Sequence, residues 1–446
     1  MRPLIGIRRE DKNKWERRAP LVPADISDLE RRHDLRFLVQ PSSIRVYPDQ
    51  EYAAAGITIS EDLGPAAIIF AIKEVPAHLI QAGKVYVFFA HVAKGQPHNM
   101  AMLRRLMELG CSLVDYEKVS DEQKRRLIFF GRHAGYAGMI ETLWCLGQRL
   151  ALIGMPTPLA RVRHAYEYPD LPAAKEHLRA LGEEIARSGL SHRVRHLIIG
   201  FSGYGHVSTG AQEVLDCLQP ASIRVADLPP MASTPPASLA PLAKVVFREE
   251  DMVVPKDKDQ PFNLLEYYEH PERYEGCFER HLPHLDALVN AIYWEPRYPR
   301  LVTRAWARRN YLPDSLPRLK VIGDVSCDLE GSIELTVRTA EPSNPCYVYL
   351  PEEGVAREGI EGIGPVIMAV DNLPCEIPKE SSQYFSSVLR EMVNPLASAD
   401  WQAPYEFLNL PPYLKRAVIV HQGELTPDYR YLHKHLDAGP QPAGWS

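Results

Sequence analysis

Short apolar runs alternate with amphipathic segments along the first 120 residues of the chain. The runs of strand length are residues 3–8, 37–40, 67–74, 85–91 and 112–116. Between them, a helix is predicted to begin near Pro23, and Met and Leu recur at helical spacing within residues 100–109. Strands that alternate with helices in this way predict a parallel sheet covered on both faces.

A second α/β pattern fills the middle of the chain. Its predicted helices are residues 133–152, which open with Gly135 and Gly138, and the charged segment 173–188. Its predicted strands are residues 197–202, 223–227, 286–294 and 319–326. Residues 381–396 then predict a helix that returns to the first domain.

The run at 197–202 leads into the most informative motif, a glycine turn followed by a helix. Gly203 and Gly205 form the Gly-x-Gly core of a dinucleotide-binding fingerprint, and Ser208 stands where a third glycine is usual. Gly203 permits the tight turn, and Gly205 lets backbone N–H groups approach a pyrophosphate. The residues expected to bind the dinucleotide here are Gly203, Tyr204, Gly205, His206 and Val207.

An acid is expected at the end of the strand that follows such a helix. Asp227 ends the predicted strand 223–227, about 20 residues after Gly205, where it would accept from a ribose hydroxyl. This acid favours NAD(H), because a carboxylate would repel the 2′-phosphate of NADP(H). Arg224 is expected to face away from Asp227, since residues three apart in an extended strand lie on opposite faces.

These patterns predict an α/β fold with two Rossmann-like domains, whose parallel sheets flank a cleft and which are linked by long helices. The substrate domain is expected to comprise residues 1–135 plus about 377–446, and the dinucleotide-binding domain residues 136–376. A chain of 446 residues provides enough length for two such domains.

The composition excludes several classes of function. Hydrophobic residues make up 45% of the chain, and no apolar run is long enough to span a bilayer. The net charge of −6 argues against nucleic-acid or anionic-membrane partners. The seven cysteines include no CxxC pair, and the N-terminal apolar stretch is too short for a signal peptide. We therefore expect a cytoplasmic protein with reduced thiols.

Two basic side chains follow neighbouring apolar runs of the first domain. Lys73 comes late in the run 67–74, and His91 ends the run 85–91. Open parallel sheets bind ligands at the carboxyl ends of their strands, and burial lowers the pKa of a lysine toward values useful in acid–base chemistry. Lys73 and His91 are therefore candidate catalytic groups; the alternative is two solvated residues at strand ends.

Further charged residues follow other predicted strands. Arg17 or Arg18 could hold a substrate carboxylate through a bidentate fork, unless this segment is a solvated loop. Asp324 and Asp328 end a strand of the second domain, where an acid could contact cofactor ribose or the reacting centre, or cap the next element. The pair at 281 and 284 has no matching cysteines or acids, so no metal is expected.

Motifs of one known family occur in the family's order along nearly the whole chain. They are Arg8-Arg-Glu-Asp11, Trp15-Glu-Arg-Arg-Ala-Pro20, Phe88-Phe-Ala-His91, Gly135-Tyr-Ala-Gly-Met-Ile140, the segment 203–212, His270-Pro-Glu-Arg-Tyr274, Ile292-Tyr-Trp-Glu295, the segment 324–334 and Asp371-Asn-Leu-Pro374. The chain resembles the lysine–2-oxoglutarate reductase family. These are the lysine-forming saccharopine dehydrogenase modules of bifunctional aminoadipic semialdehyde synthases, related to alanine dehydrogenase and the transhydrogenase N-terminal region.

The resemblance implies roles for individual residues. Lys73 and His91 match the acid–base pair of the family, and Arg18 matches its carboxylate-binding arginine. The glycine turn, with Asp324 and Asp328, matches the cofactor side. The other residues placed around the substrate are Arg17, Glu74, Lys94, Gln96, Glu117 and Arg126.

The reaction implied by the resemblance is the reversible condensation of L-lysine with 2-oxoglutarate to saccharopine, the first step of lysine degradation. The resemblance favours NADPH as reductant, whereas Asp227 favours NADH. The resemblance is compatible with a separate, glutamate-forming saccharopine dehydrogenase as a partner enzyme. It is also compatible with a homo-oligomeric state. The alternatives are an opine-type or amino-acid dehydrogenase with a different amine or keto acid, and a non-catalytic dinucleotide-binding subunit.

Overall fold

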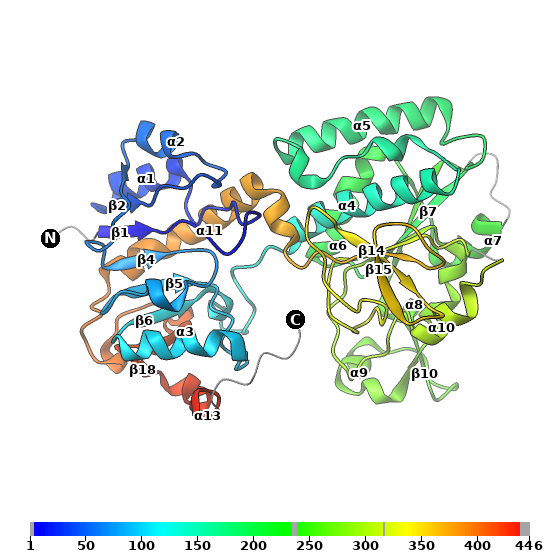
Figure 1. Ribbon diagram of the computed structural model, residues 1–446. Coiled ribbons are helices and arrows are strands. Elements are labelled where there is room, and N and C mark those ends of the chain that lie inside the picture. The colour runs from blue at the N-terminus through cyan, green and yellow to red at the C-terminus, as the bar shows by residue number, and fades with distance from the viewer. Residues whose placement is uncertain (1–3, 234–238, 315–316, 438–446) are drawn as a thin grey trace. The chain divides into compact units, whose positions relative to one another are not determined.

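The computed structural model describes residues 4–233, 239–314 and 317–437 and divides into two compact units. The first unit comprises Met1–Phe130 and Pro378–Ser446, and the second comprises Gly131–Ile377 (Figure 1). A long helix begins directly after each crossing point, α4 (Gly131–Leu152) after the first and α11 (Pro378–Ser398) after the second. Each unit is an α/β layer structure, so the predicted fold class is confirmed.

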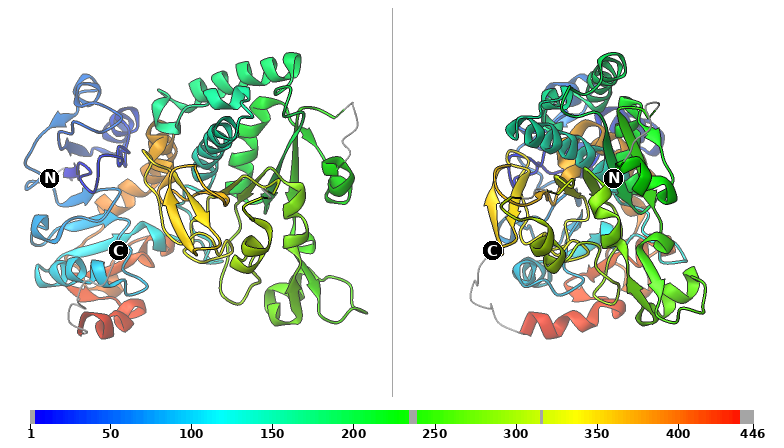
Figure 2. Two further views of the ribbon diagram at one scale, coloured as in Figure 1. Left: turned by 45° about the vertical axis from the view of Figure 1, so that its right-hand side comes forward. Right: turned by 90° about the vertical axis from the view of Figure 1, so that its right-hand side faces the viewer.

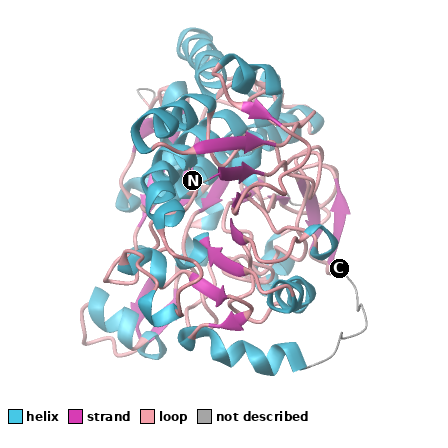
Figure 3. Ribbon diagram, turned by 90° about the vertical axis from the view of Figure 1, so that its left-hand side faces the viewer, coloured by secondary structure: helices cyan, strands magenta, loops and turns pink. Residues whose placement is uncertain are grey.

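The first unit contains an eight-stranded sheet in the order β18-β17-β6-β5-β4-β1-β2-β3. Figure 3 shows strands in magenta and helices in cyan. Its strands are β1 (Leu4–Ile7), β2 (Arg36–Val39), β3 (Thr58–Ile59), β4 (Ile68–Phe70), β5 (Val85–Phe88), β6 (Ser112–Asp115), β17 (Val418–His421) and β18 (Glu424–Leu425). Strands β1 to β6 are parallel, while β17 pairs with β6 in the antiparallel sense. The carboxyl ends of β1, β4, β5 and β6 therefore lie along one edge of the sheet.

The helices of the first unit cover this sheet. They are α1 (Pro23–His33), α2 (Asp49–Ala54), α3 (Pro97–Glu108), α11, α12 (Pro412–Lys415) and α13 (His433–Asp437). The helix α11 packs against α1, and its Ser382 and Ser386 hydroxyls accept hydrogen bonds from the N–H groups of Ala19 and Val22. These contacts join the C-terminal segment to the start of the chain within one core.

The second unit contains another eight-stranded sheet, in the order β15-β14-β16-β13-β12-β7-β9-β8. Its strands are β7 (Leu197–Ser202), β8 (Ala221–Ser222), β9 (Leu242–Phe247), β12 (Ala287–Asn290), β13 (Val321–Asp324), β14 (Cys346–Leu350), β15 (Val355–Glu358) and β16 (Val366–Met368). The central strands are parallel and buried on both faces: Ile199 packs into one hydrophobic cluster and Ile198 into another, as alternation along a strand requires.

The helices of the second unit are α4, α5 (Leu171–Ser188), α6 (His206–Leu215), α7 (Leu228–Ser233), α8 (Glu249–Met252), α9 (Leu264–Glu269) and α10 (Arg304–Asn310), with α5 along the outside of the unit (Figure 2). Two of them, α4 and α6, pack unusually closely. A Cβ atom at Gly135 of α4 would collide with the backbone of Val207, and one at Gly210 of α6 with the backbone of Arg132. Glycine at both positions lets α4 lie against the helix of the fingerprint.

The structure also corrects the sequence expectations in detail. The predicted strands 67–74 and 85–91 end early, at Phe70 and Phe88, so their last residues form turns. The predicted strand 223–227 is wrong: the strand there is β8, and Val225–Asp227 is a 3₁₀ turn. No helix among the described residues has the length and apolar character needed to cross a membrane.

Candidate active site

Lys73 and His91 lie in the turns that follow the two central strands of the first sheet. Strands β4 and β5 are adjacent, and each turn begins at the same sheet edge. The backbone of His91 adopts the left-handed conformation, with a φ of 48°, which is uncommon for a residue with a side chain. The structure thus places the two groups that the sequence singled out in turns after adjacent strands.

The imidazole of His91 is held by a carboxylate. Its Nδ1 atom lies 2.6 Å from Oε1 of Glu74, and the second oxygen of Glu74 lies 3.0 Å from Nζ of Lys12. Hydrogen bonding and charge from His91, with help from Lys12, outweigh burial and hold the pKa of Glu74 well below its usual range. An ionised Glu74 accepts the Nδ1 proton, so Nε2 of His91 is the nitrogen left for chemistry.

The ammonium group of Lys73 is in an environment that disfavours its charge. Burial lowers its pKa below the ordinary value, and the positive charges of Arg18 and Lys12 lower it further, while Glu16 and Glu74 oppose this. A lysine with a lowered pKa is neutral for a larger fraction of the time at a given pH, and the neutral amine is the form that accepts a proton.

Arg18 is buried in the same region. Its Nε donates to Glu16 at 2.6 Å, and a second N–H pairs with the other oxygen of Glu16; both side chains are almost fully buried. The guanidinium also stacks on Phe130, 4.8 Å from the ring centre. Arg17 is directed elsewhere, because its Nε donates to the carbonyl of Ile44.

The remaining predicted substrate residues separate into two groups. Oε1 of Glu117 lies 4.0 Å from Nε2 of His91 and 3.7 Å from the exposed Arg126, so these two residues lie beside the imidazole. Lys94 is exposed, and the side chain of Gln96 accepts from the Lys94 backbone N–H at 3.0 Å. Gln96 therefore holds the turn after His91.

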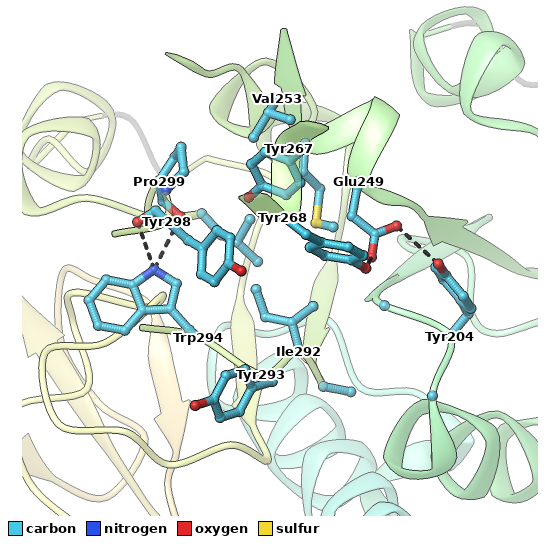
Figure 4. A pocket seen from close by; sticks show the side chains of 15 residues that line it. Tyr204, Glu249, Val253, Tyr267, Tyr268, Ile292, Tyr293, Trp294, Tyr298 and Pro299 are labelled. Carbon is cyan, nitrogen blue, oxygen red and sulfur yellow. Dashed lines mark hydrogen bonds between the residues drawn. The ribbon is translucent and has the colours of Figure 1, made fainter. Parts of the chain in front are cut away.

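The predicted glycine turn of the second unit borders a cavity of about 420 Å³. Gly203 has a φ of 87°, which requires glycine, and Gly205 caps the N-terminus of α6 with open space where a Cβ would stand. The cavity is lined largely by aromatic side chains, among them Tyr267, Tyr268, Tyr293, Trp294 and Tyr298 (Figure 4). Backbone N–H groups at a helix start and an apolar cavity beside them fit a dinucleotide.

The strand order changes which acid lies beside the glycine turn. Strand β9, not β8, is the neighbour of β7, and the residue that opens the helix after β9 is Glu249. Its carboxylate accepts from the hydroxyls of Tyr204 at 3.1 Å and Tyr268 at 2.7 Å, at the side of the cavity (Figure 4). The guanidinium of Arg248 lies over the Tyr204 ring.

Asp227 does not border this cavity. It lies in the 3₁₀ turn after the edge strand and forms a two-point ion pair with Arg224, at 2.7 and 2.9 Å. The expectation that Arg224 faces away is therefore wrong, because residues three apart in a 3₁₀ turn lie on the same side.

The two acids at the end of β13 and in the loop that follows it have different surroundings. Asp324 is fully buried, and it accepts from Asn290 at 2.8 Å and from the hydroxyls of Ser326 and Thr336. A carboxylate enclosed in this way organises the loop that follows β13. Asp328 is exposed on the loop that follows.

Sequence reasoning missed three acidic residues of these sites. Glu10 and Asp115 are buried under the turns that carry Lys73 and His91, and Glu249 borders the cavity. Each follows or ends a strand, which is a signal that the sequence contained. Their partners are distant in sequence, so the signal alone did not distinguish them from other acids.

Comparisons with known proteins find relatives over nearly the whole chain. The chain matches the model of the alanine dehydrogenase/PNT N-terminal domain over residues 6–137 and that of the C-terminal domain over residues 263–428. Among solved structures, an L-alanine dehydrogenase superposes with a TM-score of 0.62 at 17% identity, covering 97% of this chain and 99% of that one. A transhydrogenase from Sinorhizobium meliloti gives 0.53 at 16% identity, with 95% and 98% covered.

Curated relatives carry names from lysine metabolism. The chain is 36% identical to the α-aminoadipic semialdehyde synthase of Arabidopsis thaliana, over 99% of this chain and 42% of that protein. It is 33% identical to the mitochondrial enzyme of that name from Rattus norvegicus, over 97% of this chain and 48% of that protein. An NAD⁺-dependent, L-lysine-forming saccharopine dehydrogenase of Neurospora crassa is 25% identical, over 90% of this chain and 93% of that one.

The chain thus spans less than half the length of these synthases. The resemblance expected from the sequence motifs is confirmed over nearly the whole chain. The chain belongs to the alanine dehydrogenase/PNT family of oxidoreductases, together with the α-aminoadipic semialdehyde synthases.

Proposed function

We propose that this protein catalyses the reversible, NAD(P)H-dependent condensation of L-lysine with 2-oxoglutarate to saccharopine. The observation that carries the proposal is the group formed by Lys73, His91 and Glu74 at one sheet edge. The names of the relatives, which refer to aminoadipic semialdehyde and saccharopine, support the choice of substrates.

The residues of the first unit provide the proton transfers that this condensation needs. Lys73, with its lowered pKa, takes the proton from the attacking amine of the substrate. His91, with Nδ1 held by Glu74, protonates the carbinolamine hydroxyl from Nε2, so that water leaves. Arg18 is the proposed ligand of a substrate carboxylate, with Glu117 and Arg126 beside the imidazole.

The second unit is proposed to hold the cofactor at the glycine turn and the aromatic cavity. When bound, the reduced nicotinamide supplies the hydride that reduces the imine carbon. The N–H groups at the start of α6 would bind the pyrophosphate, and Gly205 leaves room for its approach. Glu249 would accept from the ribose hydroxyls and disfavour a 2′-phosphate. We therefore propose NADH as the reductant, with Glu249 and not Asp227 as the acid that selects it.

The test follows absorbance at 340 nm with purified protein, NADH or NADPH, 2-oxoglutarate and L-lysine, leaving out one component at a time. Oxidation that requires both lysine and 2-oxoglutarate is expected, with NADH as the better reductant. Oxidation that proceeds with another amine or keto acid but not with these would overturn the substrate assignment. Lys73→Met and His91→Ala are expected to abolish turnover while NADH binding, measured by fluorescence, persists; wild-type turnover in either variant would refute the assigned roles.

A further inference from the structure

Two buried carboxylates support the turns that carry Lys73 and His91. We propose that Glu10 and Asp115 are positioning residues, which fix the backbone of these two turns and thereby the placement of the acid–base groups. The proposal depends on the proposed function only in taking Lys73 and His91 as that pair.

Glu10 holds the turn after β4. It follows β1, and its two carboxylate oxygens accept from the N–H of Ile72 at 2.6 Å and of Lys73 at 3.0 Å. These N–H groups lie beyond the end of β4, so the sheet ladder does not satisfy them. Only 7% of Glu10 is exposed, and an N–H buried here would be costly without this acceptor.

Asp115 holds the turn after β5 through one of its oxygens. It ends β6, it is fully buried, and its Oδ1 accepts from the N–H of Ala90 at 3.3 Å and of Glu117 at 2.9 Å. Ala90 immediately precedes His91, whose left-handed backbone is intrinsically unfavourable and must be held by its surroundings. One carboxylate thus fixes both His91 and the acid that lies beside its Nε2.

The two supports are arranged symmetrically in the sheet. The order β6-β5-β4-β1 places the candidate catalytic turns on the inner strands and the supporting acids on the strands that flank them. A residue that served only to satisfy a backbone N–H could be neutral, because a neutral acceptor oxygen satisfies an N–H group as well. At Glu10 the two oxygens of one carboxylate match two consecutive N–H groups, and at Asp115 a single oxygen, Oδ1, accepts from both N–H groups.

Both acids titrate near neutrality. Burial, together with the charge of Glu16, raises the pKa of Glu10 to about 7, against the opposing effects of its two N–H bonds and Arg8. Burial and Glu117 raise the pKa of Asp115 to about 7, against its N–H bonds and His91. Tyr116 also faces Glu10, and Tyr429 faces Asp115. Both oxygens of Glu10 accept, so protonation turns one acceptor into a donor. At Asp115 protonation removes the negative charge that strengthens the two bonds to Oδ1. Each support therefore weakens as the pH falls through this range.

The variant Glu10→Gln replaces one of two accepting oxygens with an amide nitrogen that cannot accept. The variant Asp115→Ala removes the one oxygen that accepts from both N–H groups of its turn. Matched controls come from the same unit. Glu30 accepts from the N–H of Phe37 at 3.1 Å at the start of β2, on the opposite edge of the sheet, and the exposed Asp62 accepts from Gly64 at 2.7 Å. Glu30→Gln and Asp62→Ala therefore make the same two kinds of change away from the candidate site.

The primary measurement is covalent labelling without substrate across the pH range about 6 to 9. Trinitrobenzenesulfonate reports on Lys73 and diethyl pyrocarbonate on His91, each quantified by peptide mass spectrometry. Glu10→Gln is expected to shift the labelling profile of Lys73 and to leave that of His91 unchanged. Asp115→Ala is expected to shift the profile of His91 and to leave that of Lys73 unchanged. In the NADH assay, both variants should lower kcat by about tenfold or more, with NADH binding unchanged, as loss of a supporting partner commonly does.

Profiles of both variants that coincide with those of the controls would overturn the proposal, even if melting temperatures fall. If either variant does not fold, Glu10→Asp and Asp115→Glu keep the charge and displace it by one methylene; wild-type labelling in these folded variants would equally overturn it. A wild-type protein without lysine-dependent oxidation would refute the proposed function, while the labelling would still decide the role of the two acids.

Discussion

Glu74 Oε1 lies 2.6 Å from Nδ1 of His91, although 17 residues separate them in the chain. The contact exists because both residues lie in turns after adjacent parallel strands. The side chain of Asn99, near the start of α3, donates to the carbonyls of Ala90 and His91 and fixes the same turn. The geometry makes Glu74 a partner of the imidazole, a more specific role than the general substrate contact expected from sequence.

Replacement of Glu74 by Gln should therefore lower kcat by about 10- to 100-fold, because the amide cannot stabilise a charged imidazole or enforce one tautomer. The measurement is the NADH assay at saturating lysine and 2-oxoglutarate. The matched control is Glu108→Gln, which removes an exposed carboxylate that pairs with Arg105 on α3. Equal kcat in the two variants would show that the imidazole does not need this partner.

Exchange of Glu249 should alter the choice of cofactor. Glu249→Gln removes the negative charge at the cavity and is expected to lower the KM for NADPH by about tenfold relative to that for NADH. Asp227→Asn serves as the comparison, because Asp227 is paired with Arg224 away from the cavity. A shift in cofactor preference in the Asp227 variant, and none in the Glu249 variant, would return the assignment to Asp227.

The close contact of α4 and α6 should make Gly210 intolerant of substitution. Gly210→Ala places a methyl group against the carbonyl of Arg132 and should lower the free energy of unfolding by about 1–3 kcal/mol or more, as overpacking does. Thr209→Ala, at an exposed position of the same helix, should change it by less than about 0.5 kcal/mol. Urea denaturation of both variants provides the measurement; equal stabilities would mean that the helices can separate without cost.

The buried pair of Glu376 and Glu141 should make stability depend on pH. Burial, and then the charge of Glu141, raise the pKa of Glu376 well above its usual 4.5. An acid whose pKa is higher in the folded state stabilises the fold below its unfolded pKa, and this contribution is lost as the pH rises toward the folded value.

Glu376→Gln cannot ionise and should gain stability relative to the wild type as the pH rises from about 5 to 8, by up to about 1.4 kcal/mol per pH unit. Glu353→Gln, at an exposed carboxylate, is the control and should show no such trend. Thermal unfolding at a series of pH values tests this; a constant difference between wild type and Glu376→Gln would contradict it.

The sequence by itself determined the features that depend on neighbouring residues. The apolar run before Gly203 and the Gly-x-Gly turn are local patterns, so β7, the turn and α6 were predicted correctly. The position of Lys73 and His91 near the ends of apolar runs was likewise visible, because a buried parallel strand must be apolar throughout. The exact strand ends were predicted less well, because β4 ends at Phe70 and β5 at Phe88, before the expected ends at residues 74 and 91.

Only the tertiary structure decided which distant residues meet. Local pattern does not specify strand order, and β9 in place of β8 beside β7 moved the proposed ribose acid from Asp227 to Glu249. The supporting role of Glu10, whose partners lie 62 and 63 residues further along the chain, was invisible for the same reason. Sheet pairing is set by the burial of whole faces and by chain closure over long loops, and neither is encoded in a short window of sequence.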